Sequence, residues 1–141
     1  VVAFSNLRYG PVYQPTLRAL NLLLERAALP SRAPAVSPIL AARAAQVATL
    51  IRTWDAKLLA EITAENFLLD RDLADWKTLA AEKLAAIGPV KSIGALVPEN
   101  QLRGTFPIVG EKGTLHVFFT LTPERSPKVQ ALEMILAALQ H

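Results

Sequence analysis

The spacing of apolar residues in the first part of the chain is typical of helices. Leu17, Leu20 and Leu24 recur at intervals of three and four residues, which places them on one face of a helix. A helix is therefore expected over 16–29, and Pro30 ends it because proline cannot continue the hydrogen-bond pattern.

A second helix is expected to begin at Pro38. Ser37 suits an N-cap, and Pro38 occupies a first-turn position where its missing N–H costs nothing. We expect a bend or restart near residues 53–55, with Asp55 capping a short following helix. The predicted buried stripe consists of Leu40, Ala44, Val47, Ile51, Trp54 and Leu58.

A third strong helical pattern follows a short apolar run, Phe67-Leu68-Leu69, whose neighbour Asp70 is acidic. Asp72 suits the N-cap of this helix, and Gly88-Pro89 ends it. Its apolar stripe consists of Leu73, Trp76, Ala80, Leu84 and Ile87.

From residue 90 onward the period changes to that of strands. Strands are expected over 90–97, 102–109, 114–122 and 129–136. Residues 110–113 begin and end with glycine and predict a hairpin connection in which glycine supplies a positive φ.

The strand over 114–122 alternates most clearly. One face is wholly apolar and is expected to meet the helices: Leu115, Val117, Phe119 and Leu121. The opposite face carries His116, Phe118 and Thr120. Phe118 is either a singly exposed aromatic residue or part of a dimer or partner surface.

Helices followed by an antiparallel meander predict an α+β fold. We expect about three N-terminal helices packed on a curved, cone-like sheet of about four strands. The chain is assigned as one domain, 1–141, with an arm (1–14), a helical part (15–87) and the meander (90–136). Pro107, inside a predicted strand, indicates an edge position or a bulge.

Composition narrows the classes of function. The 141 residues include no cysteine, which excludes disulfides and thiol catalysis. The net charge is +3, but the basic residues are dispersed, so no nucleic-acid partner is expected. No apolar stretch is long enough to cross a membrane. A hydrophobic content of 52% indicates either a well-filled core or an apolar partner surface.

Motifs of known chemistry are missing. The chain has no Gly-x-Ser-x-Gly elbow, no Ser-x-x-Lys and no glycine-rich phosphate loop, and no cofactor is expected. With two histidines and no cysteine, no metal site is expected; His116 is assigned to a surface strand and His141 to the tail. Asp55 is the one catalytic candidate, as a cavity acid acting as general base, and its alternative role is helix capping.

Five aromatic residues are candidates for lining a cavity that holds a small apolar ligand. Their alternative role is to fill the core. They are Trp54, Phe67, Trp76, Phe106 and Phe119.

Residues from about 45 onward resemble the nuclear-transport-factor-2-like (SnoaL-like) superfamily of α+β cones. More narrowly, residues 66–134 look like the accessory domain found beside the catalytic domain of β-lactamase-related, penicillin-binding-protein-like serine hydrolases. The features that carry the resemblance are Phe67, the helix after Asp72, Gly88-Pro89, the hairpin at 110–113 and the proline-rich turn at 123–127.

The resemblance implies a non-catalytic association or ligand-binding accessory domain of an exported serine hydrolase. Its partner would be its own hydrolase domain or a second copy. The alternative is a small cavity enzyme, such as an isomerase, cyclase or epoxide hydrolase, that uses a buried carboxylate.

Overall fold

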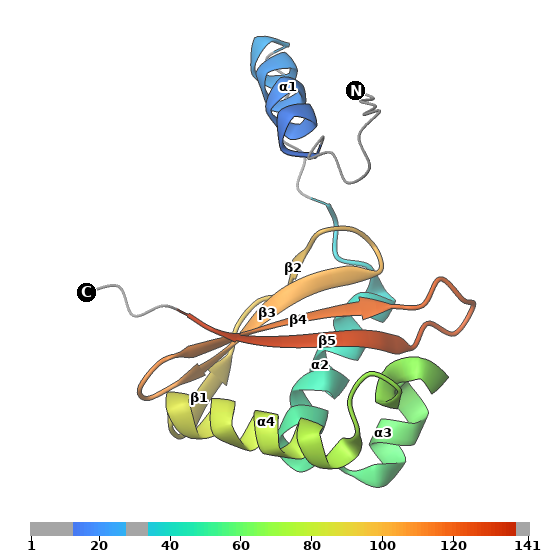
Figure 1. The fold of residues 1–141 in the computed structure, drawn as a ribbon, viewed down its shortest axis with the longest axis vertical. Coiled ribbons are helices and arrows are strands. Elements are labelled where there is room, and N and C mark those ends of the chain that lie inside the picture. The colour runs from blue at the N-terminus through green and yellow to red at the C-terminus, as the bar shows by residue number, and fades with distance from the viewer. Residues whose placement is uncertain (1–12, 28–33, 138–141) are drawn as a thin grey trace. The chain divides into compact units, whose positions relative to one another are not determined.

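The computed structural model describes residues 13–27 and 34–137 and divides the chain into two compact units, 1–33 and 34–141. The assignment of 1–141 as a single domain stays a prediction. The first unit holds helix α1, Tyr13–Arg26 (Figure 1). This helix begins three residues before its predicted start because Pro15 fits within its first turn.

Four helical elements precede the sheet in the second unit. They are α2 (Pro38–Thr53), α3 (Ala56–Ile62), the 3-10 helix η1 (Glu65–Leu68) and α4 (Leu73–Ile87).

The three predicted N-caps of these helices are confirmed. Ser37 accepts a hydrogen bond from the Leu40 N–H, and Asp55 and Asp72 cap α3 and α4 in the same way. The predicted restart between α2 and α3 is also confirmed. There Trp54 adopts a left-handed conformation, with φ 47° and ψ 40°, and its N–H bonds to the Leu50 carbonyl at 2.7 Å.

The sheet contains five antiparallel strands in the order β1-β3-β4-β5, with β2 also pairing with β3. The strands are β1 (Val90–Ile93), β2 (Val97–Pro98), β3 (Arg103–Gly110), β4 (Thr114–Leu121) and β5 (Val129–Leu136). The α+β class, with helices first and an antiparallel meander after them, is confirmed.

One predicted strand, 90–97, is wrong in extent: it is two short strands separated by residues 94–96. The Gly94 N–H donates to the Pro107 carbonyl at 2.8 Å, and a Cβ atom at Gly94 would lie 2.5 Å from Pro107 Cγ. Pro107 thus lies opposite the gap between β1 and β2, where its missing N–H leaves no ladder bond unmade.

No bulge occurs at Pro107 in its pairing with β4, since the register is continuous from Arg103 to Val109. Irregularities occur instead between Val90 and Ser92 of β1 and between Thr120 and Leu121 of β4. The edge position considered for Pro107 is wrong, because β3 also pairs with β1 and β2 on its other side.

The core lies between one face of the sheet and the helices α2, α3 and α4, which lie on the same side of it in Figure 1. The predicted inward row of β4 is confirmed, since its four side chains are at most 2% exposed: Leu115, Val117, Phe119 and Leu121. They belong to one apolar cluster with buried residues of α2 and α4 such as Val47 and Ala80.

The β3–β4 hairpin forms as predicted, but the reason for its glycines is different. Among the described glycines only Gly88 has a positive φ, 71°, and it ends α4. Gly110 is instead required by close approach, because a Cβ atom there would lie 2.2 Å from the Ile87 carbonyl oxygen.

Candidate functional site

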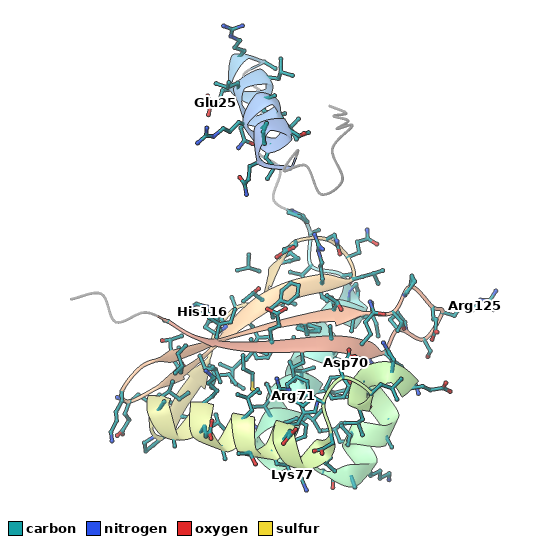
Figure 2. All side chains as sticks on the ribbon, in the orientation of Figure 1. Glu25, Asp70, Arg71, Lys77, His116 and Arg125 are labelled. Atoms are coloured by element: carbon teal, nitrogen blue, oxygen red, sulfur yellow. The ribbon has the colours of Figure 1, made fainter. Side chains whose placement is uncertain are left out.

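The face of the sheet that points away from α2, α3 and α4 is the strongest candidate for a functional surface. We call it the outer face. It presents the predicted partner residues His116, Phe118 and Thr120, because side chains of β4 alternate between the two sides. His116 is exposed, while Phe118 and Thr120 are half-buried (His116 is labelled in Figure 2).

Phe118 lies in the middle of the outer face. Directly across the strands it is paired with Thr105 of β3 and Glu133 of β5. Thr105 is paired in turn with Val97 of β2, whose side chain is 66% exposed. One row across four strands therefore runs from Val97 through Phe118 to Glu133.

The adjacent row is also largely apolar. His116 is paired with Pro107 on β3 and with Ile135 on β5, and Ile135 is 55% exposed. Sequence reasoning identified the middle of this surface but not Val97 or Ile135. The alternation of apolar and polar residues along 129–136 could have placed Ile135 on the outer face. Val97 belongs to this face because it forms the separate strand β2, which the sequence pattern did not predict.

The candidate cavity-lining aromatics are buried in the core. The rings of Trp54 and Trp76 stack at a centroid distance of 6.2 Å, and those of Phe67 and Trp76 at 5.3 Å. Phe106 meets Phe119 edge to face at 6.0 Å. Their packing matches the core-filling alternative.

The buried indoles leave two polar groups unsatisfied. Neither Trp54 Nε1 nor Trp76 Nε1 has a hydrogen-bond partner among the described residues. The Arg71 guanidinium lies 5.1 Å from the centre of a Trp76 ring, a distance suited to a cation–π contact.

Two surface depressions of the second unit lie away from these aromatics. One, of about 390 Å³, is lined by Ala64, Glu65, Asn66, Thr122, Glu124 and Lys128. The other, of about 430 Å³, is lined by Asn100, Gln101, Leu102, Arg103, Thr120, Leu121 and Gln130. Both depressions are open to solvent, unlike an enclosed apolar ligand cavity.

Every carboxylate side chain of the chain is exposed: all twelve Asp and Glu residues fall within the described ranges. Asp55, the catalytic candidate, is exposed, and its Oδ1 accepts a hydrogen bond from the Leu58 N–H at 2.7 Å. An exposed carboxylate that caps a helix does not face an enclosed cavity, where a general base would have to reach a bound substrate. The arrangement does not favour the cavity-enzyme alternative.

Within residues 13–27 and 34–137, no three His, Asp or Glu side chains converge as metal ligands would. In the same ranges, no helix combines the length and apolar character needed to span a bilayer.

Comparison with known proteins identifies no relative. No protein-family model matches the chain, and neither the curated proteins nor the solved structures contain a significant match. The resemblance to nuclear-transport-factor-2-like domains therefore stays a prediction.

Proposed function

We propose that this protein is a non-catalytic association domain that binds a protein partner through the outer face of its sheet. The observation that carries the proposal is the position of Phe118, a half-buried aromatic residue at the centre of a sheet face that α2, α3 and α4 leave uncovered. The solvent-facing side of an antiparallel sheet ordinarily carries polar residues. The outer face carries apolar residues besides Phe118, including Val97, Pro107 and Ile135.

The outer face has the size and composition of a modest interface. Three strands of eight residues, with the short strands β1 and β2 together as a fourth row, give a face of about 26 Å by about 19 Å, or about 500 Å², at the usual spacing. Covering it with a partner would bury at least about 1,000 Å² in total, near the lower bound for a specific interface. Its central position is aromatic, and its charged residues are Glu133 and Arg103, of which Arg103 forms an ion pair with Glu99 at 2.9 Å.

The resemblance to accessory domains of serine hydrolases suggests the protein in which this domain would act. The domain would serve as the accessory domain of an exported serine hydrolase related to β-lactamases, with the hydrolase domain or a second copy as partner. The protein expressed from its own gene would then have an intact mass above 15.3 kDa and be labelled by a fluorophosphonate, which reacts with activated serines. An unlabelled product of 15.3 kDa would contradict this setting but not the association itself.

A single substitution tests the outer face as a protein-binding surface. If the partner is a second copy, Phe118→Asp places a charge at the centre of the interface. The dissociation constant of the dimer is expected to rise at least about 30-fold, because a central aromatic residue contributes about 2 kcal/mol or more to binding. Light scattering coupled to size exclusion measures the change. Ala81→Asp, on an exposed position of α4, is the matched control and is expected to leave the mass unchanged.

When the partner is the hydrolase domain, the same pair of variants is compared for binding to that domain by calorimetry. Thermal unfolding followed by circular dichroism verifies that both variants are folded. Equal association of Phe118→Asp and Ala81→Asp in both settings would rule out the outer face as the binding surface.

A further inference from the structure

The net charge of the protein is concentrated in its first unit. Residues 1–33 contain four arginines and one glutamate, which gives +3, the net charge of the whole chain. Residues 34–141 contain eleven basic and eleven acidic residues and are neutral. The first unit is therefore the part of the protein that an acidic surface would attract.

Helix α1 presents leucines together with this charge. Leu22 and Leu23 are 60% and 56% exposed, and Arg18 and Arg26 are exposed as well. Arg18, Leu22 and Arg26 follow at intervals of four, so they line up along one side of the helix. We call Arg18, Leu22, Leu23 and Arg26 the basic leucine face. With Ala19, three of these residues line a depression of about 350 Å³.

The second unit carries a surface of opposite charge that also exposes leucines. Leu69 is 81% exposed, the highest value among the large apolar side chains of the described residues, and Leu68 is 38% exposed. Glu65 and Asp70 beside them are exposed. We call these four residues the acidic leucine surface. The surrounding segment, 61–82, has six acidic and two basic residues.

The backbone around Leu69 is held in place on both sides. Phe67 is buried and stacks on Trp76, and the Leu69 N–H donates to the Asn66 carbonyl at 3.0 Å. On the other side the Arg71 guanidinium covers Trp76; Figure 2 labels Asp70 and Arg71 on this connection. A leucine kept in water by a fixed backbone loses little conformational entropy on binding, as recognition residues require.

We propose that the basic leucine face of one copy binds the acidic leucine surface of a second copy. When each of two copies docks its basic leucine face on the other, the contact is made twice and the pair has two-fold symmetry. Apolar contact between leucines provides affinity, and the flanking arginines and carboxylates select the partner and its orientation. The contact uses neither Phe118 nor any other residue of the outer face, so it is independent of the function proposed above.

Charge reversal on the full 141-residue chain tests the contact by sedimentation equilibrium. The variants Arg18→Glu/Arg26→Glu and Glu65→Lys/Asp70→Lys each place like charges across both contacts, and each is expected to raise the dissociation constant at least about tenfold. Combining all four substitutions in one chain restores opposite charges, so dimerisation recovers. An equimolar mixture of the two variants also recovers, because opposite charges then meet at both contacts.

Recovery distinguishes the contact from a folding defect, since a chain damaged by either pair of substitutions would not be repaired by adding the other. Lys91→Glu/Lys112→Glu makes the same change in net charge as Arg18→Glu/Arg26→Glu, but near the C-terminal end of α4, and is expected to change the dissociation constant less than about twofold. Raising the salt from about 0.05 M to about 0.5 M weakens the wild-type dimer, because the charges are exposed.

Three results would overturn the proposal: a wild-type chain that stays monomeric at millimolar concentration, reversed variants that dimerise like the wild type, or a fourfold variant that fails to recover. A dimer that is lost with Phe118→Asp but unaffected by both charge reversals would support the outer face and reject the α1 contact. Each of the two proposals can therefore be refuted without the other.

Discussion

At the residue scale, close contact between backbone segments determines which residue type fits at some positions, independently of its polarity. Gly110 lies against the end of α4, where a Cβ atom would meet the Ile87 carbonyl oxygen at 2.2 Å and the Ile87 carbonyl carbon at 2.8 Å. The Lys112 N–H donates to the same Ile87 carbonyl at 2.8 Å. The hairpin and the helix C-terminus are thus held together by backbone atoms, with no space for a side chain at residue 110.

We therefore expect Gly110→Ala to lower the free energy of unfolding by about 2–3 kcal/mol, because backbone atoms have to move to relieve the overlap. Gly113→Ala is the matched control: its nearest neighbour would be Ile87 Cγ2 at 3.7 Å, an ordinary contact. The control is expected to change stability by less than about 1 kcal/mol. Urea unfolding compares the two, and equal stabilities would contradict the close-approach explanation.

Two local features of Trp54 are destabilising, and the packing of its ring opposes them. A bulky residue with a positive φ is strained, and its buried indole N–H is unpaired. Stacking on Trp76 and burial of its ring oppose those costs.

At the element scale, helix starts are determined by short-range chemistry. The carboxylates of Asp55 and Asp72 each accept a hydrogen bond from the backbone N–H three residues later, at 2.7 Å and 2.9 Å. Each satisfies a donor that the first turn cannot pair and places negative charge at the positive end of the helix dipole.

Replacing either cap is expected to be destabilising without affecting association. Asp72→Ala is expected to cost about 1 kcal/mol and Asp72→Asn much less, because the amide oxygen can still accept the bond. Thermal and urea unfolding measure the costs, with Glu82→Ala as the control at an exposed carboxylate in the same helix, away from its cap. A cost for Glu82→Ala equal to that for Asp72→Ala would indicate a general charge effect instead of capping.

At the scale of the whole molecule, the hydrophobic core belongs to the second unit. Every residue of the main apolar cluster falls between Leu40 and Met134. The helices α2 and α4, the connecting α3 and the inward face of the sheet supply its buried surface.

Residues 34–141 are therefore expected to fold without residues 1–33. The shortened chain should unfold cooperatively in urea with a midpoint close to that of the full chain, because it loses none of the main core. Tryptophan fluorescence reports the transition, since Trp54 and Trp76 both lie in this core. Loss of a cooperative transition would show that the first 33 residues are part of the same folding unit, as the single-domain assignment implies.

Local signals gave reliable predictions for the elements and for one face of β4. Alternation along 114–122 is enough to identify Leu115, Val117, Phe119 and Leu121 as buried, and the caps at Ser37, Asp55 and Asp72 follow from side-chain chemistry within three residues. The candidate site was predictable only at its centre, because Val97 and Ile135 join Phe118 through strand pairing.

By itself, then, the sequence determined where α2, α3 and α4 begin, which strand face is apolar and the α+β class, since each depends on interactions between residues close along the chain. Only the tertiary structure decided that 90–97 divides around Gly94, that Gly110 must lack a side chain and that the aromatic candidates stack in the core. It also decided that the carboxylates all face solvent and that Phe118 lies on an uncovered sheet face. These outcomes depend on which distant segments meet, and a local pattern carries no information about that meeting.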